Sequence, residues 1–213
     1  MLRAGAIAAL SLAAIVGSAY VGAHRGYVSA AAMATQPLEA KELADGDLVF
    51  RTGRDVMARL VLSQGESPRF SHVGVIVKQG ESAFVIHAFP HDGSTEGGVQ
   101  MESLSLFAST ENAADVGFYR VKNIDEISRQ KVRAYALRQI GKPFDNAFIF
   151  SEDAHFYCTE LALKALAAGG IDLSKSIQHV DVPTLTEPVF PPDNLRRSSR
   201  LEAIMPNREG GSV

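Results

Sequence analysis

The sequence has no tryptophan, a single cysteine, and a formal net charge of only −3 over 213 residues. Without an excess of positive charge it has no basic field for binding phosphates, so we expect no nucleic-acid partner. Aromatic residues make up only 8% of the chain, which also argues against a large surface for stacking bases. A lone cysteine excludes an internal disulfide. No cluster of His, Cys and Asp has metal-ligand spacing, so we expect neither zinc nor another cofactor.

The first 23 residues differ from the rest of the chain. Arg3 is the only charged residue before Arg25, and residues 4–23 are almost all small or apolar. A positive start followed by an apolar run is typical of a secretory signal, and a run of about 20 residues also suffices to span a bilayer. We therefore expect residues 1–23 to be either a cleaved signal peptide or an uncleaved signal anchor. Both predict export, to the periplasm or to an inner-membrane tether through residues 4–23.

The remaining chain is expected to form one folded domain, at residues 43–196, between a linker at 24–42 and a flexible tail at 197–213. Alternation and turn residues predict strands at residues 47–51, 72–78, 83–89, 99–101 and 117–121. Helical spacing predicts helices at residues 55–63, 127–140 and 158–168. Because strands come first and helices follow, the sequence predicts an α+β domain with an antiparallel sheet.

Cys158 is predicted to lie where a loop enters a helix. The commonest role of a free cysteine is that of a small buried core residue, and composition alone favours that interpretation. A helix N-terminus, however, favours negative charge and lowers the pKa of a thiol there. The position of Cys158 therefore favours a nucleophile with a lowered pKa.

Two histidines lie on the strands of a predicted hairpin. Along residues 71–77, alternation places the valines on the core face and His72 and Gly74 on the other face. A tight turn near residues 79–80 brings His87 on the returning strand within cross-strand reach of His72. A histidine that orients a second histidine, which in turn serves a cysteine, is a complete set of nucleophile, base and orienting group. The sequence therefore predicts that Cys158, His72 and His87 act together.

Five motifs in this order resemble a known family. They are GDLVFR at 46–51, SHVGVIV at 71–77, VIHA at 85–88, GKPFD at 141–145 and YCTEL at 157–161. The set resembles the permuted papain-like amidases of the YiiX/YaeF type, which are related to the NlpC-type cell-wall cysteine peptidases and to lecithin:retinol acyltransferase. The resemblance spans about residues 43–196 and implies a circularly permuted papain-like domain. Its sheet precedes a helix that begins at the catalytic cysteine, so the histidine comes before the cysteine in the chain.

The resemblance also assigns roles to residues. It implies Cys158 as the nucleophile, His72 as the base and His87 as the third, orienting group, although YiiX-like members often carry an acid there. Tyr157 is expected to line the substrate site, with a hydroxyl that donates toward an oxyanion. Glu160 is expected either to hold a substrate amine or to cap the cysteine helix.

The function that follows is an exported cysteine amidase or peptidase that forms an acyl-thioester on Cys158. Export and the resemblance make peptidoglycan stem peptides the first expected substrate. A lipid amidase or acyltransferase with the same chemistry is an alternative, because a phenylalanine-rich stretch (Phe144, Phe148, Phe150, Phe156) could line an acyl groove; ordinary core packing is the other interpretation of these rings. A non-catalytic module that binds cell wall or lipid is the second alternative.

Overall fold

The computed structural model describes residues 40–54, 68–91 and 97–204. The predicted signal segment (1–23), nearly all of the linker and the helix expected at 55–63 lie outside these residues. No helix in the described part of the chain is both long and apolar enough to cross a membrane.

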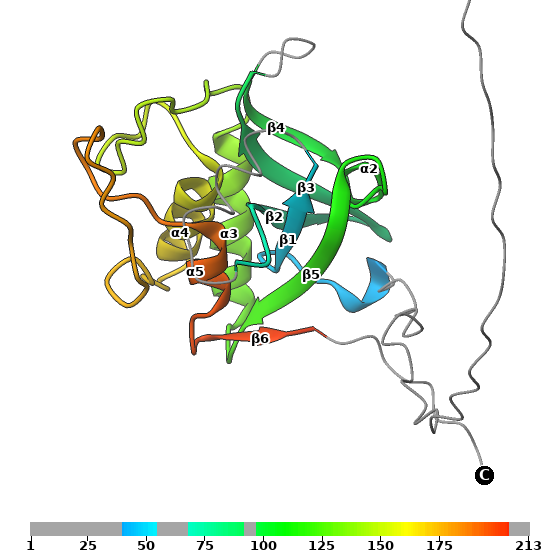
Figure 1. The fold of residues 1–213 in the computed structure, drawn as a ribbon. Helices are drawn as coiled ribbons and strands as arrows, with labels where there is room; N and C mark the ends of the chain where they lie inside the picture. The colour runs from blue at the N-terminus through cyan, green and yellow to red at the C-terminus, as the bar shows by residue number, and fades with distance from the viewer. Residues whose placement is uncertain (1–39, 55–67, 92–96, 205–213) are drawn as a thin grey trace, which may run out of the picture. The chain divides into compact units, whose positions relative to one another are not determined.

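A six-stranded antiparallel sheet forms the centre of the fold (Figure 1). Its strands are β1 (Leu48–Gly53), β2 (His72–Gln79), β3 (Ser82–Phe89), β4 (Gly98–Ser103), β5 (Ala113–Val121) and β6 (Leu201–Ala203). They lie in the order β4-β3-β2-β1-β5-β6, so β4 and β6 form opposite edges. The five predicted strands all appear, and each neighbouring pair is antiparallel.

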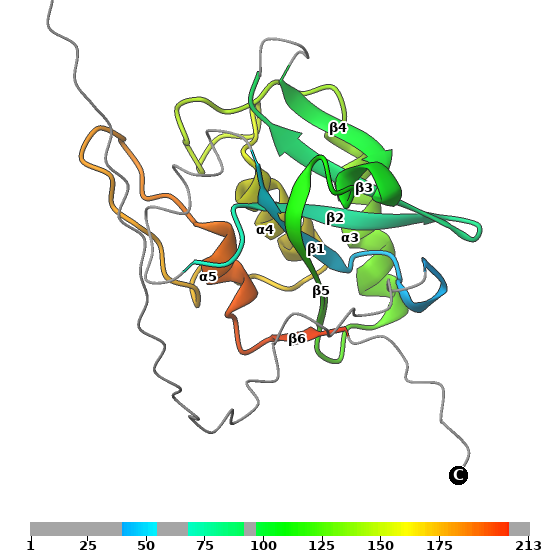
Figure 2. The same cartoon turned by 45° about the vertical axis from the view of Figure 1, so that its right-hand side comes forward.

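The helices lie on both faces of the sheet (Figures 1 and 2). The helices α3 (Glu126–Arg138) and α4 (Cys158–Ala168) pack against β2 on one face. On the other face, the short α2 (Leu104–Phe107) packs against β3 and β4. A 3-10 turn, η2 (Ala40–Glu42), precedes the sheet, and α5 (Pro192–Arg196) packs against α4. The α+β prediction is therefore confirmed.

Both faces of the sheet are buried at β2. The three valines predicted to face the core, Val73, Val75 and Val77, lie in the larger hydrophobic core together with α3 and α4. Ile76, on the opposite face, is also fully buried, in a smaller core that includes Phe107 of α2. The alternation of β2 was thus predicted correctly, but its second face is covered as well.

A buried carboxylate fixes the start of β1. Asp47 is fully buried and accepts two hydrogen bonds from Arg120 of β5, at 2.8 and 2.6 Å. It also accepts hydrogen bonds from Arg129 of α3 at 3.1 Å and from the Ala44 N–H at 2.8 Å. Gly46 precedes it with φ +79°, in the left-handed region that favours glycine. The Gly-Asp motif therefore serves to join β1, β5 and α3.

The C-terminal boundary of the domain differs from the prediction. We expected residues 197–213 to form a flexible tail, and this was wrong for residues 197–204, which include β6. The backbone of β6 pairs with β5, Ile204 N–H donates to the Phe118 carbonyl at 2.8 Å, and Leu201 is buried. A strand of three residues is too short to show an alternation pattern, so only the unpaired edge of β5 specifies it.

The loop before α4 is closed at its base. Residues Phe144 and Phe156 form an isolated bridge, in which Asp145 N–H donates to the Phe156 carbonyl and Phe156 N–H to the Pro143 carbonyl, both at 3.1 Å. Residues 146–155 therefore leave and rejoin the fold at one place, two residues before Cys158. Within this loop Phe148 packs on Tyr157, with ring centroids 5.2 Å apart.

Candidate active site

Cys158 is the first residue of α4, as the motif predicted, and it is partly exposed. Its sulfur lies 3.8 Å from the Thr159 hydroxyl. Burial raises the pKa of the Cys158 thiol, and hydrogen bonds from Thr159 and from the backbone of Val73 offset only part of that effect. The expectation of a lowered pKa was therefore wrong in direction, because desolvation outweighs the helix N-terminus.

His72 and His87 are in direct contact. The Nε2 atom of His72 lies 2.8 Å from Nδ1 of His87, and the two rings meet edge to face. The β2–β3 register pairs Val75 with Ile86, which places His87 opposite Gly74 and diagonal to His72. A Cβ on Gly74 would lie 3.2 Å from the His87 Cβ and 2.3 Å from a Val85 methyl group. Gly74 therefore leaves the space in which the two histidines meet.

Both imidazoles are held in their neutral form. Burial, followed by the positive charge of Arg51 and by His87, lowers the pKa of His72 well below its usual value. Burial also lowers the pKa of His87, although Glu102 opposes that shift. A neutral imidazole is the form that accepts a proton, which is the form that a general base requires.

The helix that begins at Cys158 packs against β2, the strand that begins at His72. The backbone of Val73, the residue after His72, lowers the pKa of the Cys158 thiol, so the sulfur lies near this part of β2. Within the described residues no direct hydrogen bond joins this sulfur to the His72 ring. Because Nε2 of His72 contacts His87, Nδ1 is the only other nitrogen of that ring that can accept a proton. Catalytic hydrogen bonds are often formed only when substrate binds.

A carboxylate that we did not predict contacts the second histidine. Glu102 of β4 lies 3.0 Å from Nε2 of His87, so His72, His87 and Glu102 follow one another in space. Arg51 lies 3.7 Å from the same carboxylate oxygen and donates to the Phe107 carbonyl at 3.1 Å. The Phe107 ring stacks on His72 and contacts His87 edge to face, so α2 encloses this part of the site.

The two predicted substrate-binding residues lie at the same helix start and are buried. Tyr157 is 2% exposed, and burial raises the pKa of its hydroxyl, which therefore stays protonated. Glu160 is fully buried, accepts a hydrogen bond from the Tyr157 N–H at 3.1 Å, and lies 2.9 Å from the Lys164 ammonium. These contacts are those of a helix-capping carboxylate. A role for Tyr157 or Glu160 in contacting substrate stays a prediction.

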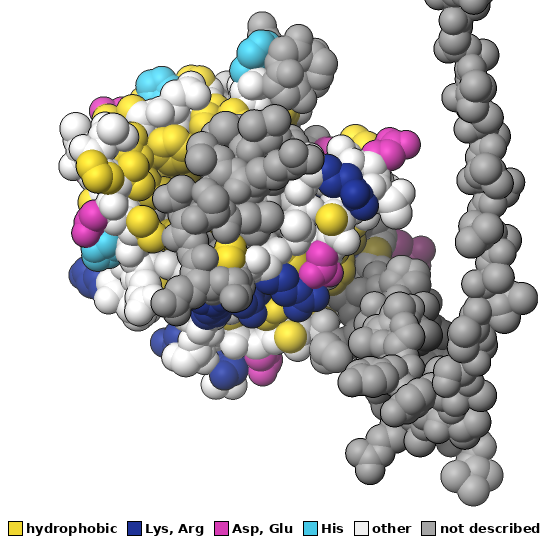
Figure 3. Space-filling view, in the orientation of Figure 1, with side chains coloured by type: hydrophobic (Ala, Val, Ile, Leu, Met, Phe, Trp, Pro, Cys, Tyr) yellow, Lys and Arg dark blue, Asp and Glu magenta, His cyan; other side chains and the backbone are white. Residues whose placement is uncertain are grey.

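The phenylalanine-rich stretch packs on itself and on its neighbours. Phe156 is fully buried, Phe150 packs on Phe190 with centroids 4.9 Å apart, and Phe144 packs on Phe148. In the view of Figure 3, hydrophobic side chains gather over the loops that flank α4. Among the described residues these contacts favour core packing over an open acyl groove.

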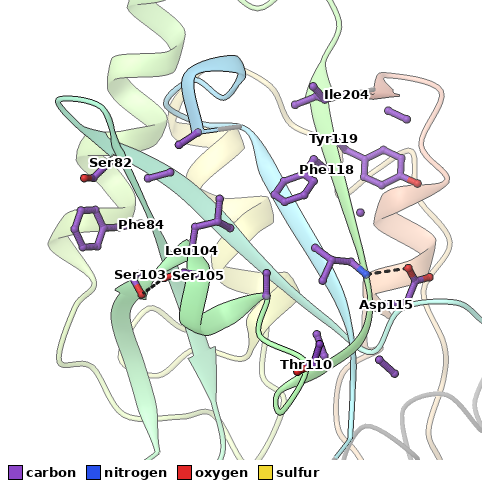
Figure 4. Close-up of a pocket in the computed structure, with 18 of the residues that line it drawn as sticks. Ser82, Phe84, Ser103, Leu104, Ser105, Thr110, Asp115, Phe118, Tyr119 and Ile204 are labelled. Atoms are coloured by element: carbon purple, nitrogen blue, oxygen red, sulfur yellow. Dashed lines mark hydrogen bonds between the residues drawn. The ribbon is translucent and has the colours of Figure 1, made fainter. Parts of the chain in front are cut away.

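A separate groove of about 1110 Å³ lies on the α2 side of the sheet (Figure 4). Residues from β3, β4, α2, β5 and β6 line it, including Phe84, Leu104, Phe118 and Ile204, and Cys158 is not among them. Among the described residues, no group of three or more His, Cys, Asp or Glu side chains is arranged to hold a metal ion.

The order and placement of these parts define a class of protein. A sheet that carries the paired histidines comes first in the chain, and a helix that begins with a cysteine packs against it afterwards, which is the papain-like arrangement in permuted order. The chain belongs to the permuted papain-like amidases of the YaeF/YiiX type, the C92 family, whose sequence pattern matches residues 42–206. At the level of the family, this is a cysteine amidase or peptidase.

A solved structure shows the same fold. The chain is similar to the metalloprotein YiiX from Escherichia coli O157:H7, with a TM-score of 0.65 and 19% sequence identity. The similarity covers 78% of this chain and 98% of that one. No curated protein sequence is similar enough to add to this assignment.

Proposed function

We propose that this protein is an exported cysteine amidase that cleaves peptidoglycan stem peptides through an acyl-thioester on Cys158. The observation that carries the proposal is the 2.8 Å contact between Nε2 of His72 and Nδ1 of His87, beside a helix that begins at Cys158. Thiol acyl transfer requires a thiol served by an oriented, neutral histidine, and Cys158 at the start of α4 and His72 on β2 are proposed for these roles.

The chemistry begins from an uncharged pair, because the thiol has a raised pKa and His72 a lowered one. As the sulfur attacks the amide carbonyl, the thiol proton moves to Nδ1 of His72. The imidazolium then protonates the departing amine, and the C–N bond breaks to leave the thioester. Water, deprotonated by His72, attacks the thioester and releases the acid and the thiol. The backbone N–H of Cys158, at the start of α4, is the natural donor to the oxyanion.

The substrate class rests on the family and on the N-terminal segment. Amidases related to NlpC-type enzymes act on cell-wall peptides, and residues 1–23 have the pattern of a signal peptide or anchor. The protein is therefore proposed to act in the periplasm, free or tethered through residues 4–23. N-terminal sequencing of the protein from isolated membranes and periplasm would test this location.

The activity is tested by incubating purified muropeptides with the wild type, Cys158→Ala and His72→Ala, and following cleavage by mass spectrometry. We expect new amine termini with the wild type only, and a loss of at least about 10³-fold in kcat/KM in either variant. Wild type quenched in acid should carry the mass of an acyl group on the peptide that contains Cys158.

Parallel reactions with long-chain fatty amides and esters distinguish the alternatives. Turnover of these lipids without muropeptide cleavage would replace the substrate by a lipid and keep the chemistry. Equal ligand binding by wild type and Cys158→Ala, with no turnover of any substrate, would show a binding module and overturn the amidase.

A further inference from the structure

We propose that Glu102 is a positioning residue, which fixes the tautomers of His87 and His72 so that Nδ1 of His72 is free to receive the thiol proton. This inference rests on the proposed function for its catalytic meaning. It adds a fourth residue to the set of Cys158, His72 and His87, and this residue lies on β4 at the edge of the sheet.

The contacts between Glu102, His87 and His72 determine which nitrogen of each ring carries the proton. An ionised carboxylate only accepts hydrogen bonds, so the atom of His87 that faces Glu102 at 3.0 Å, Nε2, must carry a proton. In a neutral ring Nδ1 of His87 is then an acceptor. The atom that faces it at 2.8 Å, Nε2 of His72, must therefore be the donor. Nδ1 of His72 is left without a proton, which is the state that a base toward Cys158 needs.

Arg51 and Phe107 hold the Glu102 carboxylate and the two imidazoles in these contacts. Arg51 lies 3.7 Å from the carboxylate oxygen that faces His87, which places a positive charge beside that oxygen. The guanidinium of Arg51 is itself held by the Phe107 carbonyl, and its central carbon lies 4.4 Å above the Phe107 ring. Phe107 in turn stacks on His72. On the α2 side of the sheet, the Glu102 carboxylate, both imidazoles and the Arg51 guanidinium are therefore joined by one continuous set of contacts.

Without an acceptor at Glu102, His87 has no reason to prefer the Nε2–H tautomer. If His87 carried its proton on Nδ1, it would donate to Nε2 of His72 and force the His72 proton onto Nδ1. Nδ1 of His72 would then be a donor and could not act as a base toward Cys158. In serine proteases, a wrong tautomer at the catalytic histidine lowers kcat by about 10⁴-fold.

The test is ¹⁵N NMR of the histidine rings at neutral pH, in wild type, Glu102→Gln and Glu102→Leu, together with kcat and KM on muropeptides. We expect both His72 and His87 as Nε2–H tautomers in wild type. Glu102→Gln retains an acceptor oxygen and should retain both tautomers and most of kcat. Glu102→Leu should show mixed tautomers at His72, with kcat lowered at least about tenfold and KM changed less than about twofold.

Glu202→Leu is the matched control, since it removes an exposed glutamate from β6 at the opposite edge of the sheet and should change neither readout. Unchanged tautomers in Glu102→Leu, or an Nδ1–H tautomer on either ring in wild type, would overturn the inference. If Glu102→Leu does not fold, the wild-type and Glu102→Gln spectra still decide it. If wild type cleaves nothing but the tautomers follow Glu102, the positioning role stands and the amidase proposal fails.

Discussion

Two buried polar clusters on this sheet use carboxylates in different ways. Asp47 contacts two guanidinium groups and a backbone N–H, all of which keep their protons at any physiological pH. Glu102 contacts one imidazole, which contacts a second imidazole. The first cluster joins three elements and cannot transfer a proton. The second consists of groups that can exchange protons along their contacts.

The difference teaches that burial of a carboxylate does not identify a functional site, and that the titration of its partners does. A carboxylate paired with arginine stabilises the fold because its charge is permanently compensated. A carboxylate paired with histidine controls where a proton lies. The comparison predicts that changes in the first cluster affect stability, and that changes in the second affect turnover.

The largest expected effect is at His87, where a substitution should lower turnover more than it lowers stability. His87→Leu removes the acceptor for Nε2 of His72 and should lower kcat/KM by about 10³-fold. His87→Gln keeps an acceptor oxygen and should retain at least tenfold more activity than His87→Leu, by roughly the worth of one catalytic hydrogen bond. The measurement is steady-state hydrolysis of muropeptides, with thermal unfolding as the control. Equal activities of the two variants would show that His87 does not orient His72.

The converse effect is expected at Asp47. Asp47→Asn breaks its ion pairs with Arg120 and Arg129, and should lower the free energy of unfolding by about 3 kcal/mol, since it leaves buried cations uncompensated. Turnover per folded molecule should stay unchanged at temperatures below the transition. Urea unfolding followed by circular dichroism checks the first statement. A stable variant with impaired turnover would mean that the two clusters are not separate.

Glu160 falls between the two clusters. It is a buried carboxylate that itself changes protonation state, but its charged neighbour is a lysine and not a histidine. Burial raises the pKa of Glu160 to about 7, above its ordinary value of 4.5, despite the nearby Lys164 ammonium. Between these values the folded protein holds the proton more tightly than the unfolded chain, so protonation stabilises the fold. As the pH rises from about 4.5 to 7, Glu160 should therefore lower the free energy of unfolding by about 2 kcal/mol.

The measurement is urea unfolding at several pH values in wild type and Glu160→Gln. The difference between the two profiles isolates Glu160 from other titrating groups, and the variant should be flatter in this interval. Parallel profiles would show that Glu160 keeps an ordinary pKa in the folded protein.

The histidine pair could be predicted from the sequence because the information is local. Strands β2 and β3 are joined by a two-residue turn, with Gln79 paired to Ser82, so alternation and turn length determine the register. Only the diagonal placement differed, because Gly74 rather than His72 lies opposite His87. The helix start at Cys158 was likewise visible in the motif and in the spacing of the apolar residues that follow it.

Glu102 could not be found in this way. Val85 pairs with Glu102, but the connection between β3 and β4 is too long to determine a register from alternation alone. The pKa of Cys158 was missed for a related reason. A helix N-terminus can be recognised in a motif, whereas the desolvation that opposes it comes from segments distant in the sequence.

The closed base of the loop before α4 has a consequence for how this scaffold diversifies. The backbone pairing at Phe144 and Phe156 holds both ends of residues 146–155, so the path of the chain between them does not determine where Cys158 lies. Doubling the length of such a loop costs only about 0.6 kcal/mol in closure entropy. A change in the length of this loop therefore need not move the start of α4, provided that the contacts of Phe148 and Phe150 are kept. The bridge thus makes residues 146–155 a segment whose length can vary between related chains without redesign of the sheet or of α4.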